Sequence, residues 1–161
     1  MNTKHTNGVN VIKSMNTAWW VERWSELQPD KPAILFEREK ISYRALHRRA
    51  NRTSCWLQSL DIEKGDRVAV MLNNCPEFIE LYLACSRLGA IFVPINFRLA
   101  GPELEYTLKN SKPKLFVFGY EYADDISILN LSDVLPLMQF ATVGSQTGFL
   151  RTLNYSSGTA A

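Results

Sequence analysis

The sequence predicts an α/β fold with a parallel or mostly parallel sheet, flanked by helices in a three-layer arrangement. Three short runs, 68–72, 91–95 and 115–118, are nearly continuous in apolar residues, as strands covered on both faces are. Between them lie two segments of helical period, 76–88 and 101–110, each long enough to connect parallel strands. This alternation is typical of consecutive βαβ units.

Proline and glycine mark the ends of these predicted elements. Pro76 suits the first position of a helix, and Gly89 suits the left-handed residue that ends it. Gly101 is a candidate N-cap for the second crossover helix. Pro94 has no N–H group to donate, which favours an edge position or a bulge for the strand at 91–95.

The segment before this unit predicts a helix docked on the domain. In residues 16–27, Trp20, Trp24 and Leu27 recur at helical spacing, and the sequence QPDKP ends the pattern. A membrane-surface helix is the alternative, but the segment has no basic face to attract it to anionic lipid. We therefore expect docking against the protein core.

Residues 32–43 predict a short hairpin, with its turn at 37–39 and a long helix directly after it. Ser42 is the expected N-cap of that helix. Its apolar positions form one continuous inward stripe. The stripe consists of Tyr43, Leu46, Ala50, Thr53, Leu57 and Leu60.

Basic residues of the same helix lie mostly off this stripe. They are Arg44, His47, Arg48, Arg49 and Arg52. They lack the interleaved aromatic residues or glycines of a nucleic-acid or phosphate site, so a solvated helix face is the expectation. His47 has no partner at metal-ligand spacing, so no metal site is expected.

The C-terminal third has a weaker pattern, with a short helix and then a strand near 138–143. Residues 144–161 are rich in Gly, Ser and Thr, which predicts a linker or loop. We expect residues 1–15 to be a disordered extension and residues 16–143 to form one α/β subdomain.

Composition excludes several classes of protein. With 161 residues, 46% hydrophobic and 21% charged, the chain can bury a core, and its net charge of +2 forms no basic tract for nucleic acid. Cys55, Cys75 and Cys85 are odd in number and unpaired in pattern, which favours reduced thiols and a cytoplasmic location. Neither a signal peptide nor a membrane span is expected.

Two loops bear on ligand binding. The turn after Leu72, Asn-Asn-Cys-Pro, has no glycine, so it lacks the usual means of bringing backbone N–H groups against a phosphate. Arg98 follows the carboxyl end of a predicted strand and precedes a predicted helix, where open α/β sheets bind anionic ligands. The alternative is that Arg98 pairs with a carboxylate such as Glu103 or faces water.

Three blocks together resemble adenylate-forming enzymes, particularly acyl-CoA synthetases (fatty-acid–CoA ligases). They are ISYRAL at 41–46, GDRVAVMLNNCPEFIELYLACSRLGAIFVPINFRL at 65–99 and PELEYTLKNSKPKLFV at 102–117. The resemblance covers residues 17–118, and the order and spacing of the blocks carry it. It implies an incomplete N-terminal subdomain of the adenylate-forming fold.

The resemblance also implies an activity. The family joins a carboxylic acid, here a fatty acid, to ATP with Mg²⁺, and then transfers the acyl group to the thiol of CoA. It assigns none of that chemistry to the three blocks, so no catalytic residue and no metal ligand is expected in this chain. Arg98 is the single candidate binding residue, for a phosphate of CoA.

YSSGT at 155–159 is similar to the start of the family's phosphate loop, but Ala-Ala follows it, without the second glycine and the lysine. We therefore expect a truncated N-terminal fragment that needs no cofactor of its own and is inactive alone. The alternative is a non-enzymatic binding or self-association module with the same fold, which would form a homo-oligomer.

Overall fold

The computed structural model describes residues 16–99, 101–129, 131, 138–144 and 151–153. The predicted extension at 1–15 and the YSSGT sequence lie outside the described residues, as does most of the predicted linker. The described part therefore contains nearly all of the residues from 16 to 143.

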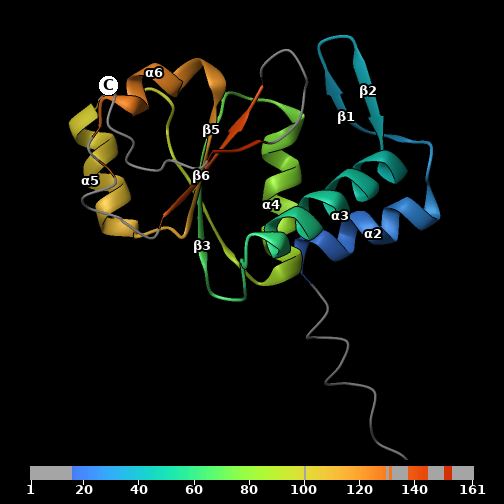
Figure 1. Ribbon diagram of the computed structural model, residues 1–161. Helices are drawn as coiled ribbons and strands as arrows, with labels where there is room; N and C mark the ends of the chain where they lie inside the picture. The colour runs from blue at the N-terminus through green and yellow to red at the C-terminus, as the bar shows by residue number, and fades with distance from the viewer. Residues whose placement is uncertain (1–15, 100, 130, 132–137, 145–150, 154–161) are drawn as a thin grey trace, which may run out of the picture.

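The centre of the fold is a five-stranded sheet in the order β4-β3-β5-β6-β7 (Figure 1). Its first four strands are parallel, and the last pairs antiparallel with β6. The strands are β3 (Arg67–Met71), β4 (Ile91–Pro94), β5 (Leu115–Gly119), β6 (Gln139–Val143) and β7 (Arg151–Leu153). The predicted α/β class and the three predicted core strands are confirmed, and β7 lies in the segment predicted as linker.

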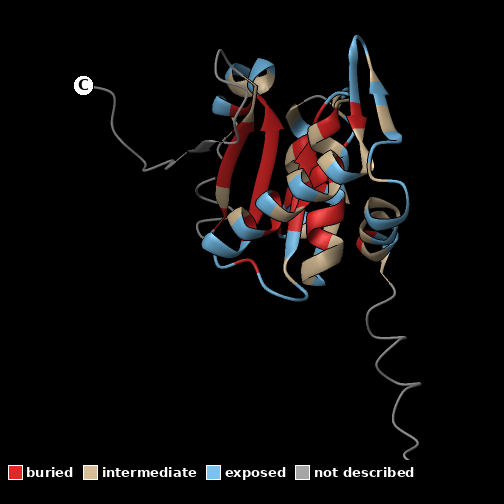
Figure 2. Ribbon diagram, turned by 90° about the vertical axis from the view of Figure 1, so that its right-hand side faces the viewer, coloured by how far each residue is buried: buried red, intermediate tan, exposed pale blue. Residues whose placement is uncertain are grey.

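Helices cover both faces of the sheet, which makes three layers (Figure 1). On one face α3 (Tyr43–Ser59) and α4 (Pro76–Leu88) pack against alternate strand residues such as Val68 and Val117. On the other, α5 (Gly101–Ser111) and α6 (Ala123–Ser127) pack against the intervening ones such as Phe116. Figure 2 shows the strands buried between these layers.

Helix α2 (Thr17–Leu27) lies against both α3 and α4 (Figure 1). The predicted helix is confirmed, but the predicted inner face is wrong in part, because Trp20 is 52% exposed and Leu27 56% exposed. The small Ala18 is buried instead, in a cluster that also contains Val21. Trp24, the remaining residue of the predicted face, does pack on α3, where its ring stacks on Tyr43 with centroids 5.8 Å apart.

The hairpin is confirmed, with β1 (Pro32–Phe36) antiparallel to β2 (Glu39–Ser42). It projects past the end of α3 in Figure 1. Ser42 caps α3 as predicted, because its Oγ accepts a hydrogen bond of 3.2 Å from the N–H of Ala45.

Most of the predicted boundary residues are in the expected places. Pro76 is the first residue of α4, and Gly89 ends that helix with φ 72°, in the left-handed region. Pro94 lies in β4, which is an edge strand of the sheet. Gly101 differs from the prediction, because it is the first helical residue of α5 and not its N-cap. No helix in the described part of the chain has the length and hydropathy needed to span a membrane.

Candidate functional site

The carboxyl ends of β3, β4 and β5 meet at one edge of the sheet because the three strands are parallel and adjacent. The chain leaves β3 for β4 on one side and returns to β5 on the other side. This reversal makes a topological switch point between β3 and β5, the place where open α/β sheets bind ligands. The loops that follow these three strands are therefore the candidate site.

Arg98 lies in the loop after β4, as predicted, and its side chain is exposed. Its guanidinium lies over the ring of Phe97, with Cζ 5.6 Å from the ring centroid. Its backbone N–H donates to Oδ1 of Asn96 at 3.0 Å. The ion pairs found among the described residues do not include Arg98.

At the switch point, side chains from the loops after β3 and β5 bond to one another near the surface. The amide of Asn73, after β3, accepts a hydrogen bond of 2.9 Å from the hydroxyl of Tyr122 and donates one of 2.8 Å to Oε1 of Glu121. Both partners lie in the 3₁₀ turn Tyr120–Tyr122 (η1) after β5. No local sequence pattern predicts this contact, because Asn73 and Tyr122 are 49 residues apart.

The start of α4 does not provide a phosphate site. Cys75 occupies the N-cap position without a side-chain capping hydrogen bond, Pro76 removes one N–H, and Glu77 places a carboxylate in the first turn. That carboxylate already complements the positive end of the helix dipole and repels an anion. Burial raises the pKa of the Cys75 thiol to about 11, which disfavours the reactive thiolate form at neutral pH.

Two of the basic residues on α3 have structural partners that the sequence did not predict. Arg49 contacts Glu39, Glu77 and Glu80 at 3.0, 3.5 and 2.6 Å and is not simply solvated. His47 lies between Ser25 of α2 and Asn51, with ring nitrogens 3.0 Å from each partner. No group of three or more metal-ligating side chains occurs among the described residues, and these two contacts give His47 a packing role.

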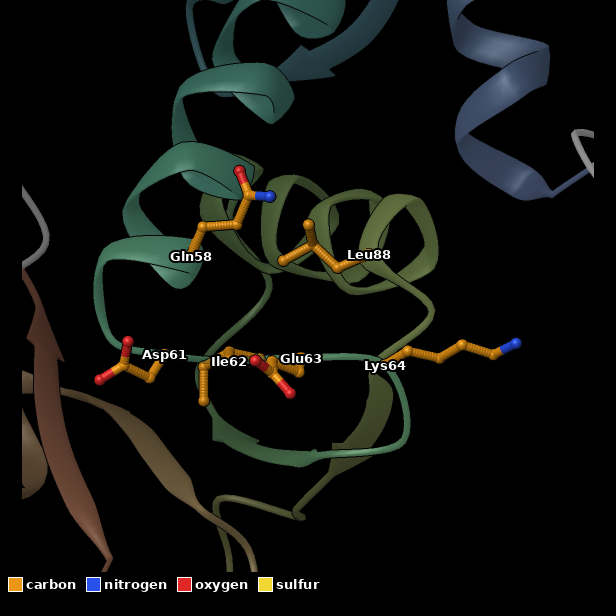
Figure 3. Close-up of a pocket in the computed structure, with 6 residues that line it drawn as sticks. All are labelled: Gln58, Asp61, Ile62, Glu63, Lys64 and Leu88. Atoms are coloured by element: carbon orange, nitrogen blue, oxygen red, sulfur yellow. The ribbon is translucent and has the colours of Figure 1, made fainter.

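A hollow of about 330 Å³ lies beside the ends of α3 and α4 and the loop that precedes β3, whereas Arg98 follows a strand at the other end of the sheet. Figure 3 shows the residues that line this hollow. They are Gln58, Asp61, Ile62, Glu63, Lys64 and Leu88. Figure 3 shows the Lys64 side chain extending away from the others.

Next to this hollow, Lys114 forms a 2.9 Å ion pair with Asp66, which also accepts from the Glu63 N–H. The hydrogen bond from Lys114 is the main cause that lowers the pKa of Asp66. Asp61, Glu63 and Lys64 are all exposed to solvent. We therefore interpret the hollow as a feature of the hydrated surface and not as a ligand site.

The fold thus defines a protein of the parallel α/β class, with Arg98 exposed in a loop at the carboxyl ends of the parallel strands. A sequence model of the family described as AMP-binding enzyme matches residues 21–159, and the chain belongs to this family. The crotonobetaine/carnitine–CoA ligase of Salmonella paratyphi A is 34% identical over 143 residues, which is 86% of this chain and 28% of that enzyme. The resemblance to adenylate-forming ligases seen in the sequence is confirmed.

Solved structures agree. A putative long-chain-fatty-acid CoA ligase from Rhodopseudomonas palustris has a TM-score of 0.74 at 30% identity, covering 85% of this chain and 35% of that one. The N-terminal domain of FACL13 from Mycobacterium tuberculosis has a TM-score of 0.74 at 31% identity, covering 82% and 34%. The chain spans just over a quarter of the length of the curated relatives that it matches.

Proposed function

We propose that this chain provides the N-terminal α/β part of an ATP-dependent acyl-CoA ligase. In the first step of the complete reaction, a carboxylic acid, for which we propose a fatty acid, reacts with ATP to give an acyl-adenylate and pyrophosphate. In the second step, the acyl group passes from the adenylate to the thiol of CoA. The family match over residues 21–159, together with relatives named as CoA ligases, carries this proposal. The three unpaired thiols agree with a cytoplasmic setting.

Within that reaction we assign Arg98 to a phosphate of CoA. Its guanidinium is exposed at the carboxyl edge of the sheet and is held over Phe97. A guanidinium binds phosphate through charge-assisted hydrogen bonds, so its removal should weaken CoA binding about tenfold.

The described residues do not fit ATP and Mg²⁺. The turn after β3 has no glycine, α4 begins with Glu77 in its first turn, and the described residues hold no cluster of metal-ligating side chains. A triphosphate needs backbone N–H groups or cations to offset its charge. We therefore propose that the 161-residue chain alone forms no acyl-adenylate, and that this unit serves as scaffold and CoA contact.

A chimera tests this function. Residues 21–143 replace the aligned segment of the Salmonella crotonobetaine/carnitine–CoA ligase, and pyrophosphate exchange and thioester formation are measured separately. We expect both half-reactions to proceed, and Arg98→Ala to raise KM for CoA about tenfold while exchange is unchanged. Lys64→Ala, which removes an exposed cation at the other end of the sheet, is the matched control. A folded chimera without exchange activity contradicts the proposal.

A second candidate, a self-association module, is favoured by the open edge of β4. There Ile91 is 48% exposed, and Tyr82 packs its ring edge-to-face against Phe92 with centroids 5.6 Å apart. An unpaired strand edge with apolar neighbours is a template for pairing with another copy. Sedimentation equilibrium measures the oligomeric state. A dimer that Ile91→Lys dissociates supports this candidate, and a monomer at all concentrations excludes it.

A further inference from the structure

The loops after β3, β4 and β5 form one connected chain of contacts that ends at Arg98. Asn73 bonds to Tyr122 and Glu121, the ring of Tyr122 stacks on Phe97, and Phe97 lies under the Arg98 guanidinium. Every link joins side chains from different loops except the last. A series of contacts therefore connects Arg98 to the loop after β3.

The first link fixes the turn after β5. Asn73 uses both ends of its amide, with Oδ1 accepting from Tyr122 and Nδ2 donating to Glu121. Gly119 makes room for this turn, because a Cβ there would lie 2.6 Å from the Glu121 carboxylate. Burial and the Glu121 charge raise the pKa of Tyr122, so its hydroxyl keeps its proton and donates at neutral pH.

The second contact joins the turn after β5 to the loop after β4. The rings of Tyr122 and Phe97 stack with centroids 6.4 Å apart and planes 30° apart. Phe97 is half-buried, whereas its neighbour Arg98 is exposed. An exposed arginine loses side-chain entropy when it binds a ligand, and a ring that already holds its guanidinium reduces that loss.

We propose that Asn73 and Tyr122 are positioning residues for Arg98, which they hold through the Phe97 ring in the orientation that receives a phosphate of CoA. This inference rests on the proposed function of Arg98. It adds that Asn73 and Tyr122, which bond to each other at the switch point of the sheet, serve phosphate binding indirectly and do not contact the phosphate themselves.

The test uses the full 161-residue chain labelled with ¹⁵N, titrated with CoA and followed by NMR, which measures millimolar affinity. Pantetheine, which lacks the phosphates, is the ligand control. We expect Arg98→Ala to weaken CoA binding about tenfold and Tyr122→Phe or Asn73→Ala to weaken it about threefold. Tyr120→Phe is the matched control, since Tyr120 lies in the same turn with its side chain exposed.

Two further measurements separate positioning from a structural role. In an Arg98→Ala background, Tyr122→Phe should have no additional effect on CoA affinity, because its action passes through Arg98. Without ligand, the ¹⁵N relaxation of Arg98 Nε should report greater mobility in Tyr122→Leu, which lacks the ring, than in wild type.

The outcomes distinguish the two proposals. If Tyr122→Phe binds CoA like wild type, or weakens it equally with and without Arg98, the positioning inference is wrong while the role of Arg98 stands. If wild type shifts identically with CoA and pantetheine, the proposed CoA contact is wrong, and the positioning inference fails with it.

Discussion

The guanidinium Nε of Arg49 lies 2.6 Å from Oε1 of Glu80, and the same guanidinium also contacts Glu39 and Glu77. These contacts join α3 to the hairpin strand β2 and to α4. Glu80 is only 7% exposed, so its charge depends on this partner. The network therefore holds three elements together around one partly buried cation.

Replacing Arg49 with methionine should destabilise the fold, because it leaves the Glu80 carboxylate buried without a counter-charge. Loss of one partner of a fully buried pair costs about 3–5 kcal/mol, and the 28% exposure of Arg49 reduces the expectation to about 2 kcal/mol. Urea unfolding at pH 7 measures this.

Arg44→Met is the control, since Arg44 and its partner Asp30 are mostly exposed, and it should change stability by less than about 0.5 kcal/mol. Equal effects of the two substitutions would mean that Arg49 is an ordinary surface residue.

Glu80 also predicts a pH dependence. Burial raises its pKa above the usual value, more than Arg49 lowers it. The folded state therefore holds this proton more tightly than the unfolded state, and the contribution of Glu80 to stability falls as pH rises from the unfolded pKa through the raised folded pKa. Glu80→Gln removes this titration.

As pH rises from about 4 to about 7, the free energy of unfolding of Glu80→Gln should increase relative to that of wild type. The range begins near 4 because the pKa of a glutamate in the unfolded state lies near that value. Urea unfolding at each pH unit checks the trend. A difference that is flat, or that moves toward wild type, would show that Arg49 outweighs burial and that the Glu80 pKa is not raised.

The three thiols should differ sharply in reactivity. Burial raises the pKa of Cys85 to about 12 and that of Cys75 to about 11, whereas Cys55 is exposed. Alkylation proceeds through the thiolate, so iodoacetamide at pH 8 should modify Cys55 first and Cys85 only on unfolding. Mass spectrometry of timed samples reads this order, and early modification of Cys85 would contradict the packing of α4.

Gly89 should tolerate asparagine better than alanine. Its φ of 72° lies in the left-handed region, and it ends α4 before β4 begins. Alanine there should cost about 1 kcal/mol, and asparagine less, because its side chain tolerates this conformation. Thermal unfolding of both variants measures the difference, and equal stability of Gly89→Ala and wild type would rule out this strain.

The sequence predicted the features that local chemistry decides. Continuous apolar runs indicated the parallel strands, and Pro76 and Gly89 marked the ends of α4. Contacts between distant residues were beyond such reasoning. Arg49 lies off the apolar stripe of α3, yet packing brings it to a glutamate on α4, and Asn73 meets Tyr122 only because β3 and β5 are neighbours. The exposed Trp20 shows the same limit, since helical spacing cannot tell which apolar face docks.

We propose that this unit has the fold of an AMP-binding enzyme but does not bind ATP by itself. Isothermal titration of Mg·ATP into the 161-residue chain at neutral pH tests it most directly. We predict no binding in the micromolar range, because the turn after β3 has no glycine and Glu77 occupies the first turn of α4. Micromolar binding of ATP, or acyl-adenylate formed by the chain alone, would contradict this claim.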